Sequence, residues 1–291
     1  MSEGSSSLPR LSVIVPTCNR STPLARCLAG LDRQSLPSTE FEVIVVDDSG
    51  SAEDVEVLPE DTGILHLKLI RHHQNSGAAA ARNTGADAAR GPFLAFVDDD
   101  CVPESEWASR LTDLLPDSDG AALVGAVLVA EPQPSCDRVT QLLSDPMDAG
   151  DGTLVRAQTA NLAVPADGFA AVGGFDESYR GAGYEDYDFC QRWRASGRLI
   201  LAAPGAIVLH RRDTTFGMFW RQHFRYGRGA ARFYGQGAEG PHPPLKANLR
   251  RMVQTIGAGR TIAERVGHIG WIGLSQCAML AGIAAERISR S

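Results

Sequence analysis

The chain has 291 residues, of which 43% are hydrophobic and 22% are charged. This composition is typical of a globular protein with a substantial core, and it excludes a small scaffold that depends on disulfide bonds. The formal net charge is −7, but the segment from His210 to the C-terminus has thirteen Lys and Arg and only four Asp and Glu, so it carries +9 and the remainder −16. Such a basic segment could contact an anionic membrane, a phosphate-bearing substrate or nucleic acid, or form the solvated faces of surface helices.

Strands and helices alternate along the first hundred residues. Apolar β-branched runs predict strands over Leu11–Val15, Phe41–Val46, Leu65–Ile70 and Phe93–Val97, and helical spacing predicts helices over Leu24–Gln34 and Ser76–Arg90. This alternation favours a mainly parallel sheet with right-handed crossovers, in which ligands bind beyond the carboxyl ends of the strands. Three polar clusters, Thr17–Asn19, Asp47–Ser49 and Asp98–Asp100, follow predicted strands, and we expect them to share one site.

The pattern is less regular after Asp100. It predicts a helix over Trp107–Leu115, a strand over Ala121–Ala130, a loop-rich segment over Pro132–Gly152, a short helix and turn over Gly168–Asp176, a helix over Tyr184–Ser196, and short strands over Leu199–Ala203 and Ala206–Leu209. From Phe216 onward we expect helices broken by Gly235–Pro244. Ile269–Ala285 contains no charged residue, but it is short for a membrane span, which favours a buried or interfacial helix.

Three consecutive acids, Asp98–Asp100, end an apolar strand and are the most informative feature of the chain. Adjacent carboxylates repel one another and are costly to hold beside a core unless a cation neutralises them. Oxygen ligands in alternate positions suit Mg²⁺ or Mn²⁺, and such a metal usually also holds phosphates of a substrate. A solvated acidic turn is the alternative interpretation.

A second acidic group follows a glycine-rich run. Glu185, Asp186 and Asp188 lie at a predicted helix N-terminus, where the helix dipole favours carboxylates, so helix capping explains one or two of them. A carboxylate delivered to a pocket there could take a proton from an attacking hydroxyl group. His210 ends a predicted strand, which makes it a candidate metal ligand, although a lone histidine is more often a surface or capping group.

Other nucleotide-binding patterns are excluded. Gly235–Gly240 matches the dinucleotide-binding glycine pattern, but it follows a predicted helix and runs into prolines, whereas that motif works only between a strand and a helix. The chain has no P-loop sequence. The six cysteines form no C-x-x-C pair, and the first residues lack the character of a signal peptide, so we expect a reduced, cytoplasmic protein.

Taken in order, these motifs resemble the family 2 glycosyltransferases. The resemblance covers roughly Leu11 to Arg228 and rests on Val13–Arg20, Val45–Asp48, Asn75–Gly85, Phe96–Asp100, Gly173–Glu177, Tyr184–Asp186 and Leu209–His210. It implies an α/β protein of the GT-A type, with a mostly parallel twisted sheet flanked by helices and a C-terminal helical extension. It also implies a domain organisation, with a disordered leader over 1–10, a nucleotide-sugar-binding half over 11–101, an acceptor-binding and catalytic half over 102–212, and the extension over 213–291.

The resemblance further implies a metal-dependent inverting transfer of a sugar from a nucleotide diphosphate sugar, most often a UDP-sugar, to an acceptor hydroxyl. Asp186 would be the general base, with Glu185 the second choice, and Asp98, Asp100 and His210 would bind Mn²⁺ or Mg²⁺. The donor-binding residues implied by the family are Pro16, Thr17, Asn19, Asp47, Asp48, Arg82, Asp98, Asp99 and Asn161. Cys101 stands where many relatives carry another acid, so the metal affinity is expected to be slightly weaker.

Two other functions remain as alternatives. A sugar nucleotidyltransferase would carry a glycine-rich, basic loop after its first strand, where this chain has Pro16–Arg20. A non-catalytic nucleotide-sugar-binding module would not need the acids near Asp186. Aromatic and basic residues interleave over Phe219–Tyr234, but no nucleic-acid module is present, so we expect no nucleic-acid partner. We expect the extension either to cover the acceptor site or to contact the inner membrane face peripherally, and its apolar helix could form a homodimer surface.

Overall fold

The computed structural model describes residues 8–50, 64, 66–130, 135–144, 146–148, 151–181, 183–211, 214–235, 252–259 and 261–290. Most of the predicted leader, the first residue of the predicted strand at Leu65 and the break after Gly235 lie outside these residues.

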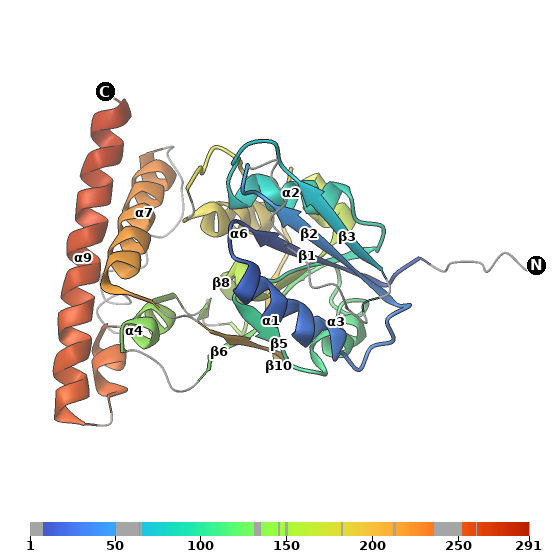
Figure 1. The fold of residues 1–291 in the computed structure, drawn as a ribbon, viewed down its shortest axis with the longest axis horizontal. Coiled ribbons are helices and arrows are strands. Elements are labelled where there is room, and N and C mark those ends of the chain that lie inside the picture. Colours follow the sequence, from blue (N-terminus) through green and yellow to red (C-terminus); the bar gives the residue numbers. More distant parts are fainter. Residues whose placement is uncertain are drawn as a thin grey trace, which may run out of the picture.

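Within the described residues, one eight-stranded sheet forms the centre of the fold (Figure 1). In spatial order its strands are β3 (Leu67–Arg71), β2 (Phe41–Asp47), β1 (Leu11–Thr17), β4 (Phe93–Phe96), β9 (Leu162–Pro165), β6 (Ala122–Val129), β10 (Ile200–His210) and β5 (Cys101–Pro103). β1–β4 run parallel, as do β6 and β10, whereas β9 and β5 are antiparallel to their neighbours. The predicted α/β class with a mostly parallel sheet is therefore confirmed.

Helices cover both faces of this sheet because alternate strand residues point in opposite directions. Val13 and Val15 of β1 pack on the side of α1 (Ser21–Asp32) and α3 (Trp107–Leu114). Ile14 packs on the other side, with α2 (Ala78–Asp87), α5 (Ala166–Ala171) and α6 (Glu185–Ala195). Because these parallel strands are buried on both faces of the sheet, their sequences are continuous apolar runs.

An aromatic cluster fixes α6 against the sheet. Phe96 of β4 contacts Phe169 and Phe175, and these rings contact Phe189 of α6 with centroids 4.8 to 5.6 Å apart. Phe189 in turn stacks near Trp193, which is fully buried. Burying each of these side chains contributes about 2 to 3 kcal/mol. The cluster therefore holds the N-terminal turn of α6, with its acids, beside the carboxyl end of β4.

Two long helices form the C-terminal part of the described chain (Figure 1). α7 (Phe216–Gly235) and α9 (Ile262–Arg290) pack side by side and run in the same direction. The backbones approach closely at Gly227 and Gly282, where a Cβ atom would overlap a carbonyl oxygen of the partner helix. α9 is long and apolar enough to cross a membrane by length and composition alone, and 28% of its apolar window is buried. The helix is longer than the predicted Ile269–Ala285, and it is less buried than a core helix.

Three sequence predictions need correction. The segment expected to be loop-rich over Pro132–Gly152 contains α4 (Ser135–Ser144) and the short strand β7 (Met147–Asp148), which pairs with β8 (Leu154–Arg156). α4 was missed because its stabilising contact is tertiary, namely its packing against α9. The two strands predicted over 199–209 are one strand, β10, with an irregularity between Ala203 and Ile207. The short strands β5 and β9 were also missed.

Candidate active site

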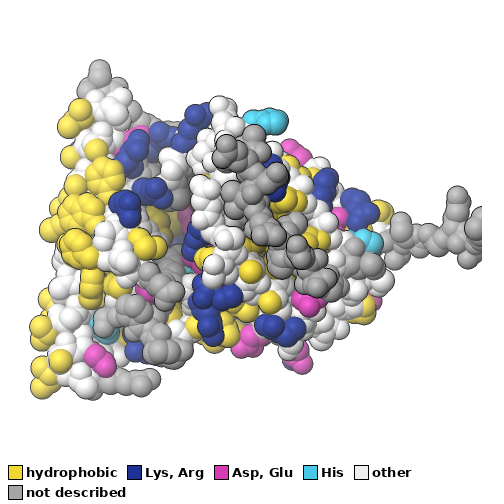
Figure 2. All heavy atoms as spheres, viewed as in Figure 1, with side chains coloured by type: hydrophobic (Ala, Val, Ile, Leu, Met, Phe, Trp, Pro, Cys, Tyr) yellow, Lys and Arg dark blue, Asp and Glu magenta, His cyan; other side chains and the backbone are white. Residues whose placement is uncertain are grey.

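A cavity of about 1610 Å³ opens at the carboxyl ends of β1, β2 and β4, the position predicted for a shared site. Its second wall comes from α7 and α9, and its third from α4 and the segment after β8. Figure 2 shows Lys and Arg side chains gathered along the border between the sheet and the C-terminal helices, while hydrophobic side chains dominate the outer surface over α9. The sheet and the helical extension thus enclose one site together.

Asp99 and Asp100 are neutralised by Arg20, which follows β1. The Arg20 guanidinium lies 2.6 Å from Asp99 Oδ1 and 2.9 Å from Asp100 Oδ2, and Thr17 Oγ1 donates a hydrogen bond of 2.8 Å to Asp99 Oδ2. Burial raises the pKa of Asp99 to about 7; Arg20 and Thr17 oppose this shift, whereas the neighbouring acids add to it. Arg20 was not singled out from the sequence, although it closes the Val13–Arg20 motif.

The candidate metal site consists of Asp100, Cys101 and His210, whose ligand atoms lie within 4.8 Å of one another. Asp100 Oδ1 lies 3.1 Å from His210 Nε2. The antiparallel pairing of β10 with β5 brings them together, because it sets His210 opposite Cys101. A carboxylate oxygen and an imidazole nitrogen fit Mn²⁺ or Mg²⁺, whereas a thiol is a soft ligand that suits these ions poorly. Asp98 is not in this group of ligand atoms.

Asp98 instead joins an ion pair with Arg82. The Arg82 guanidinium, only 4% exposed, lies 2.8 Å from Asp98 Oδ1 and 3.1 Å from Glu185 Oε1. The second carboxylate oxygen of Glu185 accepts a 2.8 Å hydrogen bond from the backbone N–H of Gly183. Arg82 therefore links the end of β4 to the start of α6 and forms an ion pair with the carboxylate of Glu185.

Asp186 has different surroundings from Glu185. Its Oδ1 accepts a 2.9 Å hydrogen bond from the backbone N–H of Tyr187, and its side chain lines the cavity. Burial and the negative charge of Glu185 raise the pKa of Asp186 to about 7, whereas Arg156 and Arg82 act in the opposite direction. Among the acids of the described residues that line the cavity, Asp186 is the one without an ion pair. A carboxylate with such a pKa is suited to exchanging protons near neutral pH.

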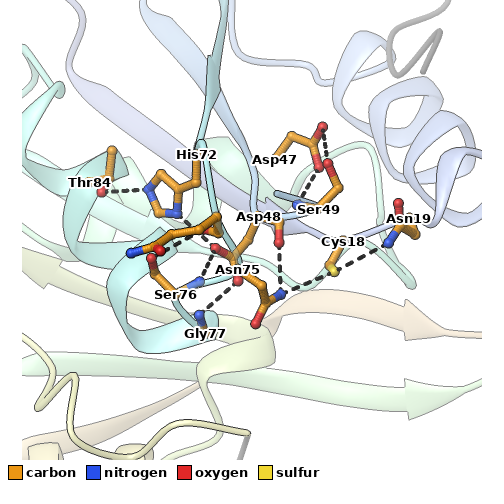
Figure 3. A network of polar contacts seen from close by, with 11 residues as sticks. Cys18, Asn19, Asp47, Asp48, Ser49, His72, Asn75, Ser76, Gly77 and Thr84 are labelled. Carbon is orange, nitrogen blue, oxygen red and sulfur yellow. Dashed lines mark hydrogen bonds and ion pairs between the residues drawn. The ribbon is translucent and has the colours of Figure 1, made fainter. Parts of the chain in front are cut away.

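The acids that follow β2 differ in role (Figure 3). Asp48 accepts hydrogen bonds from the backbone N–H groups of Ser76 and Gly77, at 2.7 and 2.8 Å, and from His72 Nδ1. These contacts anchor the start of α2 to the end of β2, at the edge of the cavity. Asp47 is 3% exposed, binds the backbone and hydroxyl of Ser49, and does not line the cavity.

Most of the predicted site residues meet at the cavity. Those that line it are Pro16, Thr17, Asp48, Arg82, Asp98, Asp99, Asp100, Glu185, Asp186 and His210. The exposed Asn19 and the buried Asp47 do not.

The predicted donor-binding residue Asn161 lies in the core. Its side chain is 1% exposed and does not line the cavity. Its Oδ1 accepts a 2.8 Å hydrogen bond from Trp107 Nε1, and its Nδ2 donates to the carbonyl oxygens of Ala126 and Ala206. Asn161 therefore joins α3 to the β6–β10 pair, because an indole N–H and two strand carbonyls buried there need polar partners.

Further cavity residues were not predicted from the sequence. Arg156 stacks over the ring of Tyr187, with its guanidinium carbon 4.9 Å from the ring centroid, and also donates a hydrogen bond to the Tyr187 hydroxyl. Tyr184 and Tyr187 stack 4.4 Å apart beside Asp186. Tyr184 belongs to the Tyr184–Asp186 motif and Tyr187 directly follows it, but Arg156 lies on β8 in a segment with no distinguishing pattern.

Comparisons with known proteins agree with this geometry. Residues 12–153 match the family described as glycosyl transferase family 2, and residues 156–212 match the family described as the N-terminal domain of galactosyltransferase. The chain is 29% identical over 228 residues to glycosyltransferase AglE of Haloferax volcanii, covering 77% of this chain and 74% of that protein. It is 28% identical over 292 residues to the pre-mycofactocin glycosyltransferase of Mycobacterium tuberculosis, covering 97% of this chain but only 57% of that protein.

Several solved structures share the fold. The mannosyltransferase PcManGT from Pyrobaculum calidifontis, in complex with GDP-Man and Mn²⁺, superposes with a TM-score of 0.66 at 17% identity, covering 98% of this chain and 89% of that one. Residues 1–349 of TarS from S. aureus, in complex with UDP, give a TM-score of 0.56 at 18% identity, covering 96% and 89%.

Proposed function

The chain belongs to the family 2 glycosyltransferases and has the GT-A fold, and within that family we propose a metal-dependent, inverting transfer from a UDP-sugar to an acceptor hydroxyl. Its activity is that of a glycosyltransferase with a nucleotide-sugar donor. The observation that supports the proposed chemistry is that one cavity contains both a candidate base and a candidate metal site. Asp186 carries no ion pair and has a pKa of about 7, while Asp100 and His210 converge at the ends of neighbouring strands.

In the proposed reaction Asp186 accepts the proton of the acceptor hydroxyl, whose oxygen then attacks the anomeric carbon of the donor sugar. One displacement breaks the bond to the nucleotide diphosphate and inverts the carbon, so no second carboxylate nucleophile is needed. Glu185 is a weaker candidate for the base because Arg82 and the Gly183 N–H already occupy its oxygens.

The donor is proposed to lie along the strand ends, near Pro16, Thr17, Asp48 and the three acids after β4. Asp100 and His210 would hold a Mn²⁺ or Mg²⁺ ion, which stabilises the negative charge that develops on the departing diphosphate. Arg82 holds Asp98 and Glu185 in place across the two halves of the site. We assign residues 11–101 to donor binding, 102–212 to acceptor binding and catalysis, and 213–291 to the helical extension.

We further propose a cytoplasmic protein that contacts the inner membrane face through α9. Several apolar side chains of this helix are more than half exposed, namely Ile262, Val266, Ile269, Leu280 and Ile288. Co-sedimentation with anionic vesicles, compared for wild type and an Ile269→Ser, Leu280→Ser variant, tests this placement. A stable dimer that hides the same side chains, detected by light scattering, would contradict it.

The enzymatic proposal is tested by a screen of UDP- and GDP-sugars for release of free nucleotide, with Mn²⁺, with Mg²⁺ and with EDTA. We expect turnover of a UDP-sugar that EDTA abolishes and that is strongly reduced in Asp100→Ala and Asp186→Asn. The exposed Asp113→Asn removes the same charge far from the site and should retain full activity. Turnover in EDTA, or unchanged turnover in Asp100→Ala, would contradict metal dependence.

A further inference from the structure

We propose that the acceptor carries an anionic group, a phosphate or a carboxylate, and that Arg221, Arg225 and Arg287 on the helical wall of the cavity bind it. This inference rests on the proposed function, since it describes the second substrate of the same site. All three arginines line the cavity that contains Asp186. Nothing in the donor chemistry requires them.

The arginines lie on the stripes by which the two helices face the cavity. On α7 this stripe contains Met218, Arg221, Gln222, Arg225 and Tyr226, with the spacing of three and four residues that keeps side chains on one helix face. On α9 it contains Gln276, Met279, Ile283 and Arg287, spaced three or four apart. The side chains of both stripes therefore point toward the same space.

The positive charge on this wall is not neutralised by the described residues. α7 contains no Asp or Glu. Arg228 and Arg232 of α7 bind Glu286 of α9, at 2.8 and 2.9 Å. Arg221 donates only to the carbonyl oxygen of Gly217, and within the described part of the chain Arg225 and Arg287 have no hydrogen bond or ion pair. Two of the helical arginines thus have a structural partner, whereas three project into the cavity without an acid.

The donor diphosphate does not account for these charges. The proposed place of the diphosphate is the opposite wall, at the strand ends, beside the candidate metal site at Asp100. Arg20 and Arg82 of that wall are already paired with acids. The helical wall contributes no acid to the cavity lining, so the two sides of the cavity differ in charge. We therefore assign an anion bound on the helical side to the other substrate.

Aromatic side chains connect the base to this basic wall. Tyr184, which stacks on Tyr187 next to Asp186, also contacts the ring of Tyr234 on α7, with centroids 6.2 Å apart. Tyr226, whose hydroxyl accepts a 2.7 Å hydrogen bond from Gln222, lies on the same stripe as Arg225. These rings can pack against an acceptor whose hydroxyl lies at Asp186 and whose anionic group reaches the arginines.

The residue type supports a phosphate or carboxylate as the ligand. The planar guanidinium group binds these two anions with paired hydrogen bonds, which a lysine ammonium cannot do. A phosphate or a carboxylate on the acceptor therefore fits the three arginines.

The test uses the full chain, first saturated with UDP and Mg²⁺ so that the donor position is filled, and then titrated with inorganic phosphate in a calorimeter. We expect wild type to bind phosphate and the Arg221→Gln, Arg225→Gln, Arg287→Gln variant to bind it at least about tenfold more weakly. The control Arg110→Gln removes an equally exposed charge on α3, whose partner is Glu106, and should match wild type. Because the triple variant could fold poorly, Arg225→Gln alone is measured too, with an expected loss of severalfold.

The outcomes separate the two proposals. If UDP binds but phosphate does not, or binds equally to wild type and both variants, the acceptor inference is wrong while the donor proposal stands. If UDP does not bind, the donor proposal fails, and phosphate titration of the nucleotide-free protein still reports on the arginines. Competition by a soluble hexose 6-phosphate supports a water-soluble acceptor. Co-sedimentation with phosphatidylcholine vesicles that contain a polyprenyl phosphate, but not with pure phosphatidylcholine, supports a lipid-linked one.

Discussion

The substitution Asp186→Asn should lower activity and weaken the pH dependence of stability in the same protein. Asparagine keeps the oxygen that accepts the 2.9 Å hydrogen bond from the Tyr187 backbone, so the local geometry is preserved. It cannot accept a proton from the acceptor. Loss of a general base reduces kcat by a factor of about 10² to 10⁴.

The stability effect follows from the pKa of Asp186, which folding raises from 3.8 to about 7. A group whose pKa is higher in the folded state stabilises the protein fully below its unfolded pKa, and this contribution is lost as the pH rises through the folded pKa. Near pH 6 the folded chain still holds the proton that the unfolded chain has lost, whereas near pH 8 neither holds it. Between these two pH values the contribution of Asp186 to the free energy of unfolding therefore falls by about 1 kcal/mol.

Urea denaturation of wild type and Asp186→Asn near pH 6 and pH 8 measures this difference. The wild-type free energy of unfolding should fall by about 1 kcal/mol more than that of the variant between the two pH values. Contributions from groups that do not interact with Asp186, such as Asp99, occur in both proteins and cancel. Asp113→Asn, at an exposed position, should follow wild type. Equal pH dependence in wild type and Asp186→Asn would refute the reasoning, because Asp186 would then titrate as an ordinary surface acid.

Three further substitutions test the architecture of the site. Arg82→Met removes a buried cation between two carboxylates and should destabilise the protein by about 3 to 5 kcal/mol in urea denaturation; a loss below 1 kcal/mol would show that the ion pairs are not structural. Gly229→Ala places a Cβ against the Gly183 carbonyl next to the base and should lower kcat severalfold, whereas Gly217→Ala on the same helix meets no atom within 4 Å and should not. Asn161→Ala should cost about 1 to 3 kcal/mol of stability but leave UDP affinity in calorimetry unchanged; weaker UDP binding in a folded variant would restore its predicted donor role.

The sequence alone indicated the strands, their parallel pairing and the edge at which ligands bind. Apolar β-branched runs such as those around Val13 and Val45 are local patterns, and the rule that parallel strands present their carboxyl ends together carries little ambiguity. Residues that directly follow a strand were therefore predicted to lie near one site. Those that line the same cavity are Asp48, Asp98–Asp100 and His210.

The tertiary structure alone decided how the polar residues are divided. Glu185 and Asp186 are adjacent in sequence, but the distant Arg82 binds one and leaves the other without an ion pair. Asn161 had the same local pattern as a donor-binding loop, yet Trp107 and two strand carbonyls hold it in the core.

The basic wall of α7 and α9 likewise could not be read from charge counts. The excess of arginines after His210 was evident in the sequence, but which of them face an acid and which face the cavity depends on how the two helices pack against each other and against the sheet. Local patterns specify what each segment is and which faces are apolar. Pairing between segments far apart in the chain depends on packing, and that pairing determines whether a charge supports the fold or remains free to bind a substrate.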